Sequence, residues 1–267
     1  MFAYKSYNPS TSNTHVPASV KKVTITKKTE LPYRAFYGCK YIEEINIPKN
    51  TTSIGSYAFY GCSALVRLNS TADGVFNIPE GVTEIQSYTF YNCLLAEVIN
   101  LRESVITIND YAFANCSSIK KFNSANEGEM VIPESVRDIK PYAFSGNISI
   151  TKLVISDSMH AISTNAFKGC TALEKVVLPF VGTKIATETE YYTVFGAIFG
   201  YDTGSIYNHP NQNYDIPKSI KKVTVTAQTV IPEYAFRNCN FIETIILPST
   251  VTSTGTNSFY GCTATVS

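Results

Sequence analysis

The sequence predicts an α/β solenoid of stacked repeats, with one parallel β-sheet face and short helical or 3₁₀ turns opposite it. Three observations support this fold class: a motif that recurs at regular steps, an apolar pattern of period two after each motif, and a Gly or Asn near the end of each motif. A repeat of roughly 20 to 50 residues is typical of solenoids, because so small a unit buries its apolar face only against its neighbours. We therefore expect function on a long exposed surface rather than in a single deep cleft.

The recurring motif is a Phe, any residue, Gly or Asn, and then Cys or Asn. Its eight copies begin at Phe36, Phe59, Phe90, Phe113, Phe144, Phe167, Phe236 and Phe259. The steps between them are 23, 31, 23, 31, 23, 69 and 23 residues. The basic unit therefore has 23 residues, and the longer steps mark insertions or a hidden unit.

A short strand is predicted after each motif. In the first unit Ile42, Ile45 and Ile47 are apolar, and the last two alternate with free positions before Pro48. Alternation in a short run of β-branched residues is typical of a half-buried strand, and a proline ends the ladder because it has no N–H. One such strand per unit, always in the same direction, predicts a parallel sheet along one face.

The motif itself predicts a turn. The residue two positions after each Phe is always Gly or Asn, and these residues adopt positive φ at the least cost. We expect a single helical or 3₁₀ turn that ends at this residue. The Phe side chain is expected to fill the core between successive coils.

The cysteines share one repeat position. All seven follow the Gly or Asn of a motif, and the remaining copy has Asn147 there. A position that accepts Cys or Asn suits a small side chain that hydrogen-bonds loop backbone. The sequence therefore predicts seven free thiols rather than metal ligands, with occasional pairing between rungs about 4.8 Å apart as the alternative.

Two units depart from the plain repeat by eight extra residues each, at 69–76 and 123–130. Both insertions begin with Asn-Ser and have Gly at the sixth position, and Asp73-Gly74 is a strong signal for a tight turn. We expect two matching hairpin-like protrusions on one edge of the solenoid. The alternative is that they are loops that the scaffold tolerates.

An irregular aromatic and Gly-rich insert occupies about residues 180–215. After it, the pattern of residues 17–62 recurs at an offset of 200, and shorter echoes of the insert occur near the start of the chain. The echo indicates a fragment of a longer array.

The repeat resembles the BspA-like, or Treponema-type, leucine-rich repeat family. The resemblance rests on stretches such as 58–65 (AFYGCSAL) and 132–139 (IPESVRDI), and it covers most of the chain outside the insert. It implies a single leucine-rich repeat solenoid of about nine units over residues 1–267. It also implies a cell-surface or secreted bacterial protein, whose export signal and anchor we do not find in this chain.

Composition excludes several functions. The chain has 22 basic and 21 acidic residues, so no net field steers it towards nucleic acid or anionic lipid. No apolar run has the length of about 20 residues that a membrane span needs. His15, His160 and His209 are far apart in sequence, and no phosphate-binding loop is recognisable, so we expect no catalytic centre, metal or cofactor.

The free positions of the strands are expected to line the outer surface of the sheet. Nine predicted rungs give a face about 40 Å long, on which basic and acidic rungs alternate. The candidate ligand-binding residues on this face are Glu43, Glu44, Asn46, Arg67, Glu97, Asn100, Lys120, Lys121, Lys152, Glu174, Lys175, Lys222 and Glu243. The candidate contacts in the three inserts are Asp73, Glu127, Tyr192, Phe195, Phe199 and Tyr201.

Two functions remain open at this point. The resemblance implies a non-catalytic adhesion module that binds a protein or glycan of a host or neighbouring cell. A passive stalk that presents another domain is the alternative, because opposite charges on neighbouring rungs also stabilise the sheet. A row of tyrosines two residues before the Phe supports either an interface or edge packing. An enzyme would require two carboxylates in a cleft beside the aromatic insert.

Overall fold

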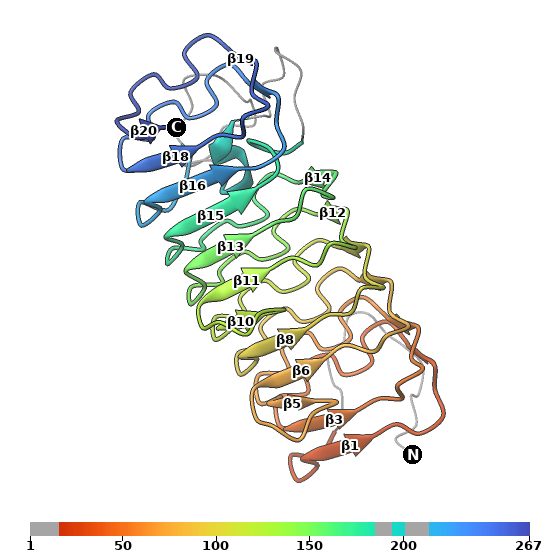
Figure 1. The fold of residues 1–267 in the computed structure, drawn as a ribbon. Helices are drawn as coiled ribbons and strands as arrows, with labels where there is room; N and C mark the ends of the chain where they lie inside the picture. The colour runs from red at the N-terminus through yellow and green to blue at the C-terminus, as the bar shows by residue number, and fades with distance from the viewer. Residues whose placement is uncertain (1–15, 185–193, 201–213) are drawn as a thin grey trace.

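The computed structural model describes residues 16–184, 194–200 and 214–267, which form a solenoid built around one long parallel sheet (Figure 1). Parallel pairing joins each neighbouring pair of its twelve strands. In spatial order these strands are β1 (Lys22–Thr24), β3 (Glu44–Asn46), β5 (Arg67–Leu68), β6 (Val75–Asn77), β8 (Val98–Asn100), β10 (Lys121–Phe122), β11 (Glu129–Val131), β13 (Lys152–Val154), β15 (Lys175–Leu178), β16 (Lys222–Val225), β18 (Thr244–Ile246) and β20 (Thr265–Val266).

A second line of shorter strands follows the proline in most coils, and the sequence pattern did not predict it. These strands have two residues each and also pair in parallel. One sheet contains β7 (Glu84–Ile85), β9 (Thr107–Ile108), β12 (Asp138–Ile139) and β14 (Ala161–Ile162), and two separate pairs are β2 (Glu30–Leu31) with β4 (Ser53–Ile54) and β17 (Val230–Ile231) with β19 (Ser253–Thr254).

The segment around each Phe is a series of turns, so the expected helical or 3₁₀ turns are not confirmed. In the first motif the N–H groups of Tyr37 and Cys39 donate to carbonyls three residues back, at 3.1 Å. The N–H groups of Phe36 and Gly38 instead donate to carbonyls of the next coil, at 2.7 Å. A helix would need all of these donors within one turn, so stacking of the coils takes the place of helix formation.

The Gly or Asn two residues after each Phe has positive φ in all eight motifs, as predicted. The residue two positions before the Phe also has positive φ, and this was not predicted. It is a Tyr in five motifs and Arg34, Asn165 or Asn257 in the others, with φ between 55° and 63°. Two left-handed residues four apart therefore define the shape of each turn.

The two eight-residue inserts are not hairpins. Each adds one more parallel strand to the sheet: β6 pairs with β5 through Leu68 and Phe76, and β11 pairs with β10 through Phe122 and Met130. The expected turn residue is correct, since Gly74 and Gly128 have positive φ. The chain returns to the same edge and resumes the same direction, which is possible because the strands are only two or three residues long.

The phenylalanines form a continuous file inside the solenoid, as predicted. Rings of successive motifs stack with centroids 5.2–5.7 Å apart from Phe36 to Phe167, and again between Phe236 and Phe259. The Phe rings in the middle of the array have no exposed surface. Phe122, from a strand, packs edge-on against Phe113 and Phe144.

The aromatic insert provides the turn that is missing between the coils of Phe167 and Phe236. Its 3₁₀ helix η2 (Phe195–Ile198) is the only helix among the described residues. The N–H of Phe167 donates to Ile198 (2.9 Å), and the N–H of Phe195 donates to Ala235 (2.8 Å). The side chains of Phe195 and Phe199 are fully buried. They belong to the core, so they do not have the ligand-contact role expected for them.

The shared Cys position is explained by one hydrogen bond. The thiols of Cys62, Cys93, Cys116 and Cys170 donate to the carbonyl of the Phe one coil earlier, at 3.0–3.4 Å. The Nδ2 of Asn147 donates to the same carbonyl position, that of Phe113, at 3.0 Å. All seven cysteines are free, and burial raises the pKa of the Cys116 and Cys170 thiols to about 12.

Candidate functional site

The outer face of the twelve-stranded sheet carries two columns of side chains that are exposed or half-exposed, with one exception at Glu129. Alternate residues of a strand point to the same side, so the residues on either side of each buried strand residue face outward. The charged column is Lys22, Glu44, Arg67, Val75, Val98, Lys121, Glu129, Lys152, Lys175, Lys222, Thr244 and Thr265. The second column is Thr24, Asn46, Asn77, Asn100, Val131, Val154, Val177, Thr224 and Ile246.

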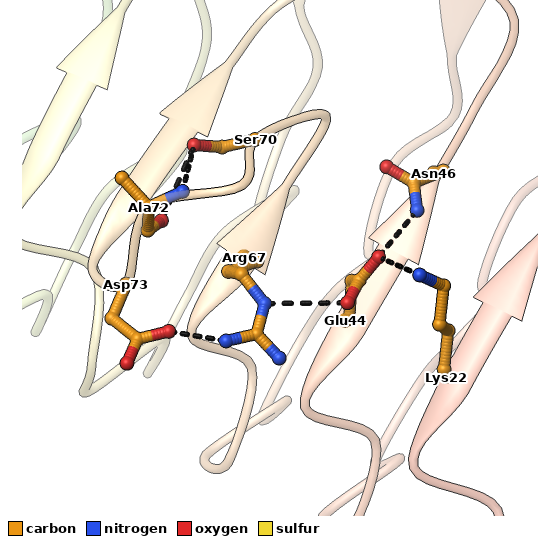
Figure 2. A network of polar contacts seen from close by, with 7 residues as sticks. All are labelled: Lys22, Glu44, Asn46, Arg67, Ser70, Ala72 and Asp73. Carbon is orange, nitrogen blue, oxygen red and sulfur yellow. Dashed lines mark hydrogen bonds and ion pairs between the residues drawn. The ribbon is translucent and has the colours of Figure 1, made fainter.

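At the N-terminal end the charged column is internally neutralised (Figure 2). The carboxylate of Glu44 lies 2.6 Å from the Lys22 ammonium and 3.3 Å from Nε of Arg67. Asn46 also donates to it at 2.7 Å, and Arg67 in turn pairs with Asp73 of the first insert. The hydrogen bonds from Lys22 and Asn46 lower the pKa of Glu44. The charged groups here therefore satisfy one another.

The second column is also self-satisfied in this half. Nδ2 of Asn100 donates to Oδ1 of Asn77 at 2.7 Å, and Nδ2 of Asn77 donates to the carbonyl of Asn69 at 2.9 Å. Asn69 has positive φ, and its side chain accepts the N–H of Ile47 at 2.8 Å. The asparagine side chains thus take the place of strand partners where the insert interrupts the ladder.

The same pairing continues into the middle of the face. Lys120 lies 3.0 Å from Glu97, and Lys121 lies 3.1 Å from Glu127 of the second insert. Outside the charged column, Glu43 pairs with Lys21 at 3.0 Å. The candidate residues Asp73 and Glu127 of the inserts therefore have a role within the sheet, as partners of basic residues on neighbouring strands.

Glu129 is a residue of this face that sequence reasoning missed. Its side chain is only 9% exposed and accepts hydrogen bonds from Lys152 and Asn126, both at 2.7 Å, and from Ser124. These bonds, that from Lys152 first, lower its pKa to about 2. The signal was present in the sequence, because Glu129 precedes an apolar pattern that ends in Ile132-Pro133, as other strands do.

The predicted alternation of charge fails in the C-terminal half. Lys152, Lys175 and Lys222 are in register on three neighbouring strands, β13, β15 and β16. Lys152 pairs with Glu129, but in the described residues no carboxylate lies within 4.0 Å of Lys175 or Lys222. Glu174 and Glu243 lie beside this column, and Glu243 contacts Lys221 at 3.6 Å.

The second column changes character at the same place. Asparagines give way to Val131, Val154 and Val177, followed by Thr224 and Ile246, and all five side chains are half-buried. A lysine column therefore lies beside an aliphatic column on β11 to β18. Figure 1 places these strands along the upper half of the sheet.

The tyrosine row forms stacked columns on the turn side of the solenoid. Tyr57, Tyr88, Tyr111 and Tyr142 stack with centroids 4.6 Å apart, and a second column of Tyr37, Tyr60 and Tyr91 stacks at 4.8 Å. Burial is the main cause that raises the pKa of Tyr57, Tyr88 and Tyr111. Each inner ring face is covered by the next ring, so this geometry favours edge packing over a ligand platform.

A cleft lies next to the aromatic insert. Its described lining includes Lys168, Lys218, Arg237 and Asp215, and Asp215 is the one carboxylate among these lining residues. It pairs with Lys168 at 3.5 Å. The described part of the cleft therefore offers no second carboxylate for the paired chemistry of glycoside hydrolysis. The remaining candidates, Tyr192 and Tyr201, lie outside the described residues.

Two further searches concern metals and membranes. In residues 16–184, 194–200 and 214–267, no three His, Cys, Asp or Glu side chains are grouped as metal ligands would be. The same parts of the chain contain no helix with the length and apolar character needed to span a bilayer.

Comparison with known proteins agrees with this architecture. The model of the BspA type leucine-rich repeat region matches the chain in six copies, over residues 29–129, 83–193 and 206–267. The chain therefore belongs to the BspA-type leucine-rich repeat family. Comparison with curated proteins gives no significant match.

Solved structures show the same fold. A leucine-rich repeat protein from Bacteroides ovatus is 23% identical, with a TM-score of 0.51, over 91% of this chain and 73% of that one. The Treponema pallidum leucine-rich repeat protein is 24% identical, with a TM-score of 0.50, over 59% of this chain and 69% of that one. The pneumococcal vaccine antigen PcpA is 20% identical, with a TM-score of 0.48, over 74% of this chain and 39% of that one.

Proposed function

We propose that the chain is a non-catalytic adhesion module of a bacterial cell-surface or secreted protein, and that it binds a protein through the outer face of its long sheet. Members of this repeat family are typically protein-binding or adhesion modules. The observation that carries the proposal is the C-terminal half of the face. There, in the described structure, Lys175 and Lys222 have no carboxylate partner and lie beside half-buried aliphatic side chains.

A passive stalk is the second candidate, and the N-terminal half of the face favours it. In that half the charged residues pair with one another and the asparagines bond to one another. Such contacts stabilise the sheet without any ligand. The two candidates differ in whether the face is needed for binding.

An array of purified extracellular-matrix proteins and glycans tests the proposal. The face variant carries K22S, E44S, K175T and E243T, and the control variant carries K40S, K49S, E103T and E134T at exposed positions off this face. Each removes two lysines and two glutamates, so net charge is matched. We expect the wild-type chain and the control to bind at least one protein on the array and the face variant to lose that binding. Absence of wild-type binding, or equal binding by all three, would favour the stalk.

A further inference from the structure

The two halves of the sheet face differ in whether their side chains need a partner. From β1 to β10 the basic side chains of the charged column are paired with carboxylates, and the second column is rich in asparagine. From β13 to β16 three lysines stack in register, and only Lys152 has a carboxylate partner in the described residues. The recognition surface therefore has an identifiable location within the long face.

Like charges directly opposite each other on neighbouring strands destabilise a sheet. Lys175 is in direct register with both Lys152 and Lys222. A bound carboxylate between two of these ammonium groups would remove the repulsion and add charge-assisted hydrogen bonds. The column is thus suited to an anionic partner.

The aliphatic column limits the kind of anion. Val154 and Val177 are separated from Lys152 and Lys175 by a single buried residue on the same strand, so the two columns run side by side. A partner that covers both must present carboxylates along one edge and apolar side chains along the other. An extended polypeptide does so when acidic and apolar residues alternate, because its side chains point to opposite sides. A sulfated glycan has no apolar edge of this kind, and the two columns present no aromatic ring on which a sugar could stack.

We propose that the face formed by β11, β13, β15, β16 and β18 binds an extended polypeptide segment in which acidic and apolar residues alternate. The segment runs along the solenoid axis, with its carboxylates on Lys152, Lys175 and Lys222 and its apolar side chains on Val154 and Val177. Alternate residues of an extended chain are about 6.8 Å apart and the rungs about 4.8 Å apart, so two carboxylates span the three lysines. This inference rests on the proposed protein-binding function and specifies its partner class.

The test uses a fluorescein-labelled peptide, acetyl-Glu-Val-Glu-Val-Glu-Val-Glu-amide, and fluorescence anisotropy at low ionic strength. Two double variants are compared with the wild-type chain: K175Q/K222Q in the unpaired group, and K22Q/K121Q at paired positions of the same column. Both lower net charge by two. We expect K175Q/K222Q to weaken binding at least about tenfold and K22Q/K121Q to change it by less than about twofold.

Further arms separate the alternatives. V154T/V177T keeps the shape and charge of the face but removes apolar surface, and it should weaken peptide binding severalfold. A peptide with lysine in place of glutamate should not bind. Equal losses in the two lysine variants would overturn the inference, because they would indicate non-specific attraction. Tighter binding of a sulfated oligosaccharide than of the acidic peptide would also overturn it.

The outcome is distinguishable from that of the proposed function. If K175Q/K222Q binds the matrix-protein array as the wild-type chain does, the adhesion proposal stands and this location is wrong. If the wild-type chain binds the acidic peptide but nothing on the array, the location stands and the adhesion proposal fails. Thermal unfolding of K175Q/K222Q at or above the wild-type midpoint shows that any loss of binding is not a loss of fold.

Discussion

Single residues in each coil have roles that are almost entirely structural. The ring of Phe113 stacks on Phe90 at 5.2 Å and on Phe144 at 5.7 Å, and Phe122 packs against its edge at 5.3 Å. A buried ring with three aromatic neighbours contributes both apolar burial and ring geometry. The file of Phe rings therefore holds the coils at a fixed spacing and sets the register of the outer face.

Truncation of this ring should be costly. We expect Phe113→Ala to lower the free energy of unfolding by about 3–5 kcal/mol, the usual range for a buried aromatic side chain. Phe259→Ala is the matched control, because Phe259 is only partly buried at the end of the file and should cost clearly less. Urea unfolding measures both. Equal losses would contradict a continuous interior.

Glu129 should make stability depend on pH. Its folded-state pKa of about 2 lies below the ordinary value of 4.5. The stability that it contributes is therefore fully present above about pH 4.5 and is lost as pH falls towards 2. We expect Glu129→Gln to reduce the acid sensitivity of the unfolding midpoint in this window, relative to Glu103→Gln at an exposed position. Identical pH profiles for the two variants would exclude this role.

Sequence reasoning predicted the Phe file, the free thiols and the left-handed Gly or Asn of each turn, because each rests on a local preference. It did not predict positive φ at Tyr57 or Tyr111, since a bulky residue adopts that conformation at a cost of roughly 1–2 kcal/mol. In the folded chain, stacked neighbours at 4.6 Å and hydrogen bonds to the next coil oppose this cost. These contacts join residues more than 20 positions apart, so the local pattern does not contain them.

At the scale of elements, the inserts show the same limit. The Asp73-Gly74 signal correctly marks a turn, but it does not specify which edge the following strand joins. The return path is short because β5 has two residues, and a parallel partner is therefore within reach of a six-residue loop. The result is a sheet with more rungs than coils, and the inserts supply Asp73, Glu127 and Glu129 to its outer face.

Deletion of one insert tests this interpretation. Removal of residues 69–76 joins Leu68 to Asn77 and recreates the plain pattern of Ile45-Asn46-Ile47-Pro48. We expect this variant to unfold cooperatively, with one strand fewer in the sheet. Removal of residues 69–72 alone leaves β6 without enough chain to return to β5, and it should be far less stable. Circular dichroism during thermal unfolding compares the two, and similar midpoints would contradict an added parallel rung.

At the scale of the whole molecule, twelve rungs give a face about 50 Å long, longer than nine predicted rungs allow. Its outward positions could be predicted from sequence, but its charge balance could not. Lys175 and Lys222 are neighbours although 47 residues separate them, and the extra rung of Glu129 takes the place of an expected basic neighbour of Lys152. Only the register shows which lysines lack a carboxylate in the described structure.

Lysine acetylation with and without the acidic peptide tests the central claim most directly. Mass spectrometry reports the rate at each lysine of the intact chain. The account predicts that bound peptide slows acetylation of Lys152, Lys175 and Lys222 and leaves Lys21, Lys22 and Lys120 unchanged. Equal protection along the whole face, or protection confined to the N-terminal strands, would contradict it.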